Sequence, residues 1–155
     1  MANPSEWGPL LWKIIHTLST KLGNQTNKIL QTDELNYYNN FTKNVGTVLP
    51  CKVCRKHYYD YALKYKKNIE YYELRDYSIN YYMNLHNEIN SEKNKPLFTN
   101  KDFLLYNTIK INEFNSFIKE LNTLLQNYVL HQYISADVVR NFNVCVQKLR
   151  SVLNY

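Results

Sequence analysis

The sequence is poor in the residues that interrupt helices. Only three glycines and four prolines occur among its 155 residues, and the alternation of apolar and polar residues that marks a strand is scarce. A chain with so few breaks favours long helices, so we predict an all-α fold. Long apolar runs are also missing, since none approaches the roughly 20 residues that a membrane-spanning helix needs. We therefore expect no membrane span.

Cysteine is scarce as well. The three cysteines, Cys51, Cys54 and Cys145, are far too few for a secreted fold that disulfides hold together. The sequence does not open with the charged and then apolar pattern of a secretory signal. These absences predict a protein of a cytosol-like compartment, where a disulfide is more often catalytic than structural.

The charge does not form a block of one sign. The formal net charge is +6, with basic residues at 55–56 and 64–67, but acidic residues are spread through the chain. A nucleic-acid-binding protein usually shows a stronger basic cluster, so we expect no nucleic-acid partner. The fifteen tyrosines, and the many asparagines, lysines and isoleucines, are typical of an AT-rich genome.

The most informative feature that is present is a Pro-Cys-x-x-Cys run at residues 50–54. If a helix begins at about Cys51, the free N–H groups at its start and its dipole favour a thiolate there. Cys54 lies about one turn further along, close enough to form a disulfide with Cys51. Arg55, Lys56 and His57 add positive charge that favours a thiolate further. This is the geometry of a redox-active pair, with Cys51 at the more exposed helix end.

Apolar residues at helical spacing divide the rest of the chain. The pattern predicts helices from about Pro9 to Gly23, from a Thr32 and Asp33 cap to Pro50, from Cys51 through Tyr65, and from about Leu74 to Ser91. Two or three more helices follow from Lys101 onward, the last after a cap at Ser135. Four helices of this length with short loops suit an antiparallel bundle, and the amphipathic C-terminal helices would pack on it or on a second subunit.

Two further groups place aromatic and imidazole side chains on one helix face. Trp12 and His16 are four residues apart, as are His86 and Asn90, so each pair shares a face. Taken alone, each group is more often ordinary core. Together with Lys95 and the cysteines, they supply the stacking surfaces, polar contacts and cation that a flavin needs. The sequence therefore predicts a flavin site.

The order of these groups resembles the Erv/ALR family of FAD-linked sulfhydryl oxidases. The family pattern of WGxxxWxxxH, PCxxC, HNxVN and KPxF is met by Trp7-Gly8, Trp12, His16, Pro50-Cys51, Cys54, His86-Asn87, Ile89-Asn90, Lys95-Pro96 and Phe98. The resemblance implies a four-helix bundle with a short fifth helix, here followed by a helical C-terminal extension. It places a FAD-binding sulfhydryl oxidase domain at residues 1–106 and the extension at 107–155, packed on the bundle or on the partner of a homodimer.

The resemblance also implies the roles of individual residues. Cys51 and Cys54 are the expected catalytic pair, with Cys54 facing the flavin and Cys51 meeting the substrate. The expected FAD-binding residues are Trp7, Trp12, His16, Tyr81, His86, Asn87, Asn90, Lys95 and Tyr106. Tyr81 stands where the family usually has tryptophan, and no metal is expected.

The activity that the resemblance implies is oxidation of protein dithiols to disulfides. Electrons would pass through Cys51 and Cys54 to FAD and then to O2, giving H2O2. The shuttle cysteine pair that many members carry in a flexible tail is missing, so the substrate is expected to reach Cys51 directly or through a small redox carrier protein. The compact form and the AT-rich bias resemble the versions of large cytoplasmic DNA viruses, which implies the host cytoplasm or the virion as the location.

Three other interpretations stay open. A thioredoxin-like oxidoreductase also begins a helix with CxxC, but it needs a βαβ framework that this pattern lacks. A zinc site would use Cys51, Cys54, His57 and His86, whose spacing is not that of standard zinc ligands. A catalytically inactive helical scaffold or virion interaction protein would keep the fold without binding flavin or consuming oxygen. Cys145, on an apolar helix face, is expected to be buried and inert.

Overall fold

The computed structural model describes residues 2–155, which fold into seven α-helices and one turn of 3-10 helix. The elements are α1 (Pro4–Lys21), α2 (Lys28–Val48), α3 (Lys52–Tyr65), η1 (Tyr71–Glu73), α4 (Leu74–Glu92), α5 (Asn100–Asn107), α6 (Ile111–Leu130) and α7 (Ala136–Leu153). None of the described residues lies in a strand, which confirms the predicted all-α fold and leaves no βαβ framework there. No helix within residues 2–155 has both the length and the apolar character needed to cross a membrane.

Two helices begin earlier than the sequence pattern predicts. The predicted start near Pro9 is wrong, because Asn3 caps α1 by accepting a hydrogen bond from the Ser5 N–H at 3.0 Å and Pro4 occupies the first turn. The predicted cap at Thr32 and Asp33 is also wrong. The Asn27 side chain caps α2 instead, accepting hydrogen bonds from the N–H groups of residues 29 and 30.

The other predicted helix starts agree with the structure. Cys51 is the N-cap of α3, α4 begins at Leu74, and the Ser135 hydroxyl caps α7 by accepting a hydrogen bond from the Val138 N–H at 3.3 Å. The short helix α5 begins with a capping box, in which Thr99 and Asp102 satisfy each other's backbone N–H groups. Side-chain caps therefore fix where the chain enters α1, α2, α3, α5 and α7, whereas α4 begins without one.

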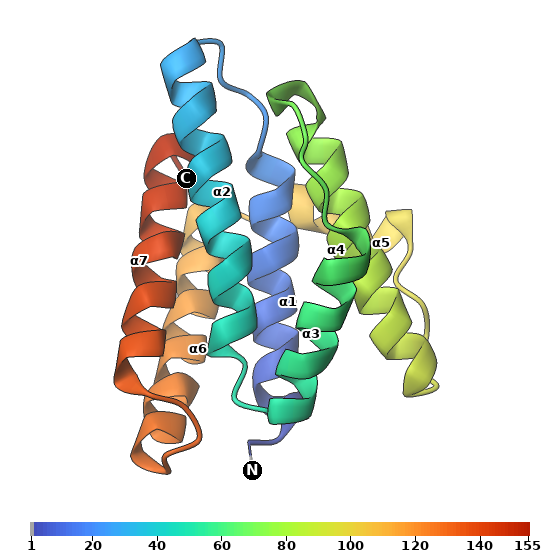
Figure 1. Ribbon diagram of the computed structural model, residues 1–155, viewed down its shortest axis with the longest axis vertical. Helices are drawn as coiled ribbons and strands as arrows, with labels where there is room; N and C mark the ends of the chain where they lie inside the picture. The colour runs from blue at the N-terminus through green and yellow to red at the C-terminus, as the bar shows by residue number, and fades with distance from the viewer. Residues whose placement is uncertain (1) are drawn as a thin grey trace.

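Helix α1 lies in the middle of the molecule (Figure 1). It contacts α4 and α5 on one side and α6 on the other, while α2 contacts α3 on one side and α7 on the other. Helices α6 and α7 thus cover one side of the α1–α2 pair, and α3, α4 and α5 lie on the opposite side. The C-terminal helices pack on helices of their own chain, while a domain boundary at residue 106 stays a prediction.

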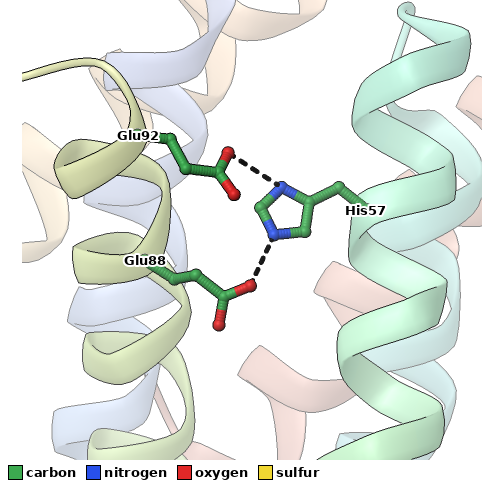
Figure 2. A group of neighbouring side chains, drawn as sticks. All are labelled: His57, Glu88 and Glu92. Atoms are coloured by element: carbon green, nitrogen blue, oxygen red, sulfur yellow. Dashed lines mark hydrogen bonds and ion pairs between the residues drawn. The ribbon is translucent and has the colours of Figure 1, made fainter.

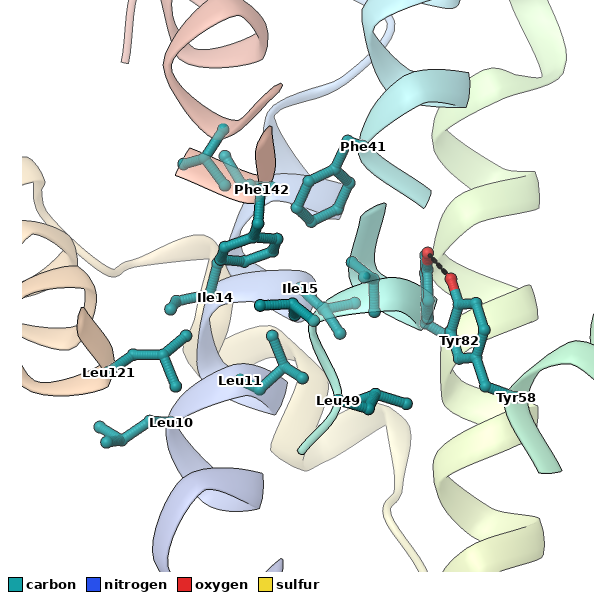
Figure 3. Packing of buried hydrophobic residues seen from close by; sticks show 14 of the residues in the cluster. Leu10, Leu11, Ile14, Ile15, Phe41, Leu49, Tyr58, Tyr82, Leu121 and Phe142 are labelled. Atoms are coloured by element: carbon teal, nitrogen blue, oxygen red, sulfur yellow. Dashed lines mark hydrogen bonds between the residues drawn. The ribbon is translucent and has the colours of Figure 1, made fainter. Parts of the chain in front are cut away.

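One continuous apolar cluster joins the C-terminal helices to the rest of the molecule (Figure 3). The rings of Phe41 on α2 and Phe142 on α7 are almost fully buried, with their centroids 6.3 Å apart. Ile14 of α1 and Leu121 of α6 belong to the same cluster, which also reaches Tyr58 on α3. The scaffold beneath the cysteine pair therefore includes α6 and α7 as well as the first four helices.

Candidate active site

The two cysteines of the CxxC run form a disulfide at the start of α3. The Cα atoms of Cys51 and Cys54 are 5.2 Å apart, and the Cys51 sulfur, as the N-cap, accepts a hydrogen bond from the Cys54 N–H at 3.2 Å. After reduction, this N–H group and the positive end of the helix dipole would stabilise a thiolate at Cys51. The predicted placement of the pair at a helix start is therefore what the structure has.

The two cysteines differ in exposure, and Cys54 is the more exposed one, although Cys51 was expected to be. Cys51 is only 3% exposed, whereas Cys54 is half-buried, so the expectation that the helix end leaves Cys51 more open is wrong. The reason is the path of the chain before the helix. Leu49 and Pro50 are buried too, and the Arg55 guanidinium donates a hydrogen bond to the Leu49 carbonyl, which ties this segment to the first turn of α3.

Helix α3 approaches α2 closely at one point. Gly46 of α2 faces the ring of Tyr58, and a Cβ atom at residue 46 would lie 2.7 Å from Tyr58 Cδ1. The Tyr58 hydroxyl donates a hydrogen bond to the Thr42 carbonyl at 2.6 Å and accepts one from the Tyr82 hydroxyl at 3.0 Å. All of these groups are buried. The lack of a side chain at Gly46 lets α3 approach α2, and the hydrogen bonds of the Tyr58 hydroxyl fix α3 between α2 and α4.

A second contact links α3 to α4 at the surface (Figure 2). His57 lies one turn after Cys54, and its Nε2 atom is 2.8 Å from a Glu88 carboxylate oxygen, while its Nδ1 atom is 3.9 Å from Glu92. The ligand atoms of these three side chains lie within 4.8 Å of one another. Within residues 2–155, no other group of His, Cys, Asp and Glu side chains gathers in this way. The alternative zinc site is therefore not assembled, because the cysteines are paired with each other and His57 faces carboxylates.

Aromatic and imidazole rings from α1, α4, α5 and the loop before α5 form what we call the imidazole cluster, defined by Trp12, His16, His86, Phe98 and Tyr106. Trp12 and His86 are stacked at 4.1 Å between ring centroids, with planes 3° apart. His16 stacks on Phe98 at 4.6 Å and also contacts Tyr106. The predicted groups on α1 and α4 thus meet, and Tyr106 of α5 joins them. Phe98 was not among the predicted site residues, although its position in the KPxF motif could have indicated it.

Both histidines of the imidazole cluster are neutral at neutral pH. Burial, helped by His86, lowers the pKa of His16 to about 3, and burial, helped by Lys95, lowers the pKa of His86 to about 4. The His16 Nε2 and His86 Nδ1 atoms are 2.9 Å apart, so one neutral ring donates a hydrogen bond to the other. The His16 Nδ1 and Trp7 Nε1 atoms are buried without a protein partner. Of these two atoms, His16 Nδ1 belongs to a stacked ring, and an unpaired polar atom there fits a planar ligand with polar groups.

The predicted asparagines hold the segment that follows α4. Asn87 makes two hydrogen bonds with the backbone of Phe98, donating to its carbonyl at 2.9 Å and accepting from its N–H at 2.6 Å. Asn90 donates to the Pro96 carbonyl at 3.2 Å. Lys95, which precedes Pro96 in the sequence, is exposed. These bonds place the Phe98 ring against the histidines. The motif therefore positions the imidazole cluster in addition to any direct role in binding.

Two further predicted site residues, Tyr81 and Trp7, lie apart from both the imidazole cluster and the segment that follows α4. Tyr81 faces α3, where its ring packs edge-on against Tyr61 and lines a cavity of about 550 Å³ between α3 and α4. Trp7 is buried in the core near the start of α1.

Cys145 is half-buried, whereas full burial was expected, and its sulfur accepts a hydrogen bond from the Asn44 amide. Burial raises the pKa of the Cys145 thiol, which fits the expected low reactivity.

The fold and the site together define an all-α domain in which a disulfide begins one helix and an imidazole cluster joins α1, α4 and α5. Residues 9–110 match the model of the Erv1/Alr family, and the chain belongs to that family. It is 31% identical over 97 residues to a probable FAD-linked sulfhydryl oxidase of Acanthamoeba polyphaga mimivirus. That match covers 63% of this chain and 65% of the relative, slightly less than two thirds of its length. No solved structure matches the chain.

Proposed function

We propose that this chain is a FAD-dependent sulfhydryl oxidase that forms disulfides in protein substrates and reduces O2 to H2O2. The observation that carries the proposal is the Cys51–Cys54 disulfide at the start of α3, in a chain of the Erv1/Alr family. The mimivirus relative, which is named as such an oxidase, supports it. Membership of the family alone would also suit an inactive scaffold; the disulfide favours the oxidase, and flavin binding with oxygen consumption distinguishes the two.

The protein part of the reaction is thiol–disulfide exchange. A substrate thiolate attacks one sulfur of the Cys51–Cys54 disulfide, forms a mixed disulfide, and releases the other sulfur as a thiolate. The second substrate thiol loses its proton and attacks the substrate sulfur of the mixed disulfide. The substrate is thereby oxidised to a disulfide, and the cysteine pair is reduced by two electrons. When bound, FAD supplies the route by which these two electrons leave the pair and reach O2.

We assign Cys51 as the sulfur that the substrate attacks and Cys54 as the one that faces FAD, as the resemblance implies. Exposure does not support the first role, because Cys51 is buried. The half-buried Cys54 leaves part of its surface free, and a cofactor would need such a surface. In the reduced pair, the Cys54 N–H would hold Cys51 as the more stable thiolate, which makes it the better leaving group when a mixed disulfide on Cys51 is resolved.

Residues of the imidazole cluster would hold the FAD. The half-buried Trp12 and Tyr106 offer ring faces, and the unpaired Nδ1 atom of the buried His16 offers a hydrogen-bonding group. The exposed Lys95, which lies close enough to His86 to lower its pKa, offers a cation for a pyrophosphate. The other proposed ligands are Trp7, His86, Asn90 and Tyr81. The assignment of Tyr81 rests on the resemblance alone, because its side chain faces α3.

The finer features of the activity are part of the same proposal. The substrates are protein dithiols, presented directly or by a small redox carrier protein, and O2 is the electron acceptor. The protein acts as a homodimer in the host cytoplasm or the virion, as a viral enzyme. The sequence relationship to a mimivirus protein supports the viral source. Light scattering of the purified protein, giving a mass near twice 18.6 kDa, would test the dimer.

An absorbance spectrum of the purified protein tests the cofactor and the reaction together. We expect flavin bands that bleach when dithiothreitol is added without air and that return when oxygen is admitted. A protein that is colourless, and that cannot be reconstituted with FAD, would instead be the inactive scaffold.

Trapping of mixed disulfides tests the two cysteine roles. In this test the substrate protein keeps one cysteine of its dithiol, activated as a mixed disulfide with thionitrobenzoate. The Cys51 thiolate of Cys54→Ser should attack the substrate sulfur and displace thionitrobenzoate, so that substrate bound to Cys51 accumulates and is detected on a non-reducing gel. Accumulation on Cys54 in the Cys51→Ser variant instead would reverse the roles and make exposure the deciding factor.

A further inference from the structure

Almost all of the excess positive charge of the chain lies on the helix that begins with the disulfide. Residues 51–67 hold six of the 19 Lys and Arg residues and one of the 13 Asp and Glu residues, a net charge of +5. The other 138 residues carry a net charge of only +1. The six basic residues are Lys52, Arg55, Lys56, Lys64, Lys66 and Lys67. The charge is therefore local to α3 and to the two residues after it.

Two of these cations, Lys52 and Lys56, lie on a surface that is free within the molecule. We define the outer face of α3 by Lys52, Val53, Lys56, Tyr59 and Leu63, all of which are exposed. Val53 and Leu63 are 73% and 87% exposed, which is unusual for apolar side chains. Cys51, the sulfur proposed to react with the substrate, is the N-cap directly before Lys52 and Val53. A segment that reaches the disulfide over this turn would meet both cations and apolar groups.

The acidic groups near α3 leave these cations largely unneutralised. Asp60 pairs with Lys56 at 2.5 Å, and the carboxylates of Glu88 and Glu92 are turned toward His57. Among the described residues, Lys52 and Lys66 form no ion pair within 4 Å. Lys67 lines the cavity between α3 and α4, in which acidic side chains also lie. The first turn of α3, beside the disulfide, therefore keeps its positive potential.

We infer that the outer face of α3 docks substrate proteins whose reacting cysteines lie in an acidic segment with at least one apolar side chain. This inference rests on the proposed oxidase function, and it names the substrate class of the same site. Charge complementarity would raise the encounter rate and orient the dithiol, while Val53 and Leu63 would bury apolar surface in the complex. A protein segment suits the face better than a nucleic acid, because only thiols react with the disulfide at its end.

Three peptides of equal length test the inference. Each carries the same Cys-x-x-Cys dithiol, flanked by Glu, Gln or Lys residues, and the oxidation of each is followed by oxygen consumption with the FAD-loaded protein. The acidic peptide should have a KM about tenfold below that of the Gln peptide at low salt, and the Lys peptide a higher KM than either. The difference should shrink as added salt shortens the Debye length.

Charge-reversal variants locate the docking surface. In the Lys52→Glu/Lys56→Glu protein, the KM advantage of the acidic over the Gln peptide should disappear. A matched control, Lys119→Glu/Lys148→Glu, makes the same change in net charge on exposed positions of α6 and α7, on the opposite side of the molecule, and should keep the advantage. Because the ratio is taken between two peptides within one variant, an altered reactivity of the disulfide cancels.

The outcomes separate this inference from the function on which it rests. Equal KM values for the acidic and Gln peptides, with turnover present, would overturn the docking surface and leave the oxidase proposal standing. No oxygen consumption with any peptide or with dithiothreitol would overturn the proposed function itself. An oligonucleotide that binds more tightly than the acidic peptide, and that the Lys52→Glu/Lys56→Glu protein no longer binds, would assign the face to nucleic acid and overturn the inference.

Discussion

Helices α3 and α7 both pack against α2, but they are held there in different ways. Helix α7 buries an apolar stripe that consists of Val139, Phe142, Val146 and Leu149. Helix α3 buries only Tyr58 and Tyr61 along its length and is otherwise held by directed contacts of side chains. The comparison indicates a division of labour. The C-terminal helix contributes stability, whereas the disulfide helix keeps its first turn and its outer face available for chemistry.

The largest expected effect comes from removing either cysteine of α3, which should abolish turnover and leave the fold intact. Cys51→Ser and Cys54→Ser on α3 should each reduce oxidase turnover with dithiothreitol by at least about a thousandfold, because no second disulfide relays the electrons. Oxygen consumption measures the loss, and urea unfolding of each variant under reducing conditions checks that the fold remains. Turnover that is retained in either variant would contradict the proposed path of the electrons.

The matching change on α7 should affect stability and leave chemistry intact. Phe142→Ala removes a ring that is fully buried against Phe41, so we expect the free energy of unfolding to fall by about 3–5 kcal/mol. Urea denaturation measures the change, and FAD content and turnover per folded molecule should stay near wild type. A variant that keeps its stability but loses FAD would show that α7 belongs to the site after all.

The close approach of α3 to α2 gives the next prediction. Gly46→Ala should cost about 1–3 kcal/mol of unfolding free energy, because the new methyl group overlaps the Tyr58 ring. Gly8→Ala is the matched control inside α1. A Cβ at residue 8 meets no atom within 4 Å, so this change should stabilise the protein by up to about 1 kcal/mol. Equal effects of the two substitutions in thermal or urea unfolding would mean that helix propensity, not the position of Tyr58, decides.

The imidazole cluster predicts a dependence of stability on pH. His16 stays neutral in the folded protein until its pKa of about 3, whereas in the unfolded chain it is protonated below about pH 6.5. Between these values the unfolded state binds the extra proton, so stability is full above pH 6.5 and falls on acidification. The slope for one such histidine is about 1.4 kcal/mol per pH unit. Urea unfolding between pH 7 and pH 5 should show this loss, and His16→Gln should show a smaller slope. An unchanged slope would contradict the neutral, buried state of His16.

Much of the fold could be predicted because short stretches of the sequence determine where its helices lie. Helices are marked by apolar spacing, the cap at Ser135 was recognisable from its side chain, and the start at Cys51 followed from Pro50 and the CxxC run. The starts at Asn3 and Asn27 were missed because asparagine is frequent in this chain, and only the folded backbone shows which copies accept N–H groups. Helical spacing likewise brought Trp12 to share a face with His16.

The remaining features of the site depend on packing between helices. Tyr81 stands five residues before His86, which turns it by about 140° around α4 and directs it toward α3. That displacement was available from the sequence, since it follows from helix geometry. The burial of Cys51 was not, because it depends on how Leu49 and Pro50 pass beneath the start of α3. The contact of Tyr58 with Gly46 likewise depends on how α3 packs against α2, which the sequence does not show.

The smallest expected effect concerns the surface link between α3 and α4. His57→Ala removes a contact of 2.8 Å to Glu88 and a longer one to Glu92, but both carboxylates are largely exposed, so water replaces the lost partner at little cost. The free energy of unfolding should fall by less than about 1 kcal/mol, well below the loss for Gly46→Ala. Lys56→Ala, which breaks the more exposed pair with Asp60, is the control and should change stability even less. If His57→Ala instead destabilised the protein as much as Gly46→Ala, the contacts with α4 would hold the disulfide helix in place. The close contact between Gly46 and Tyr58 would then not be what positions it.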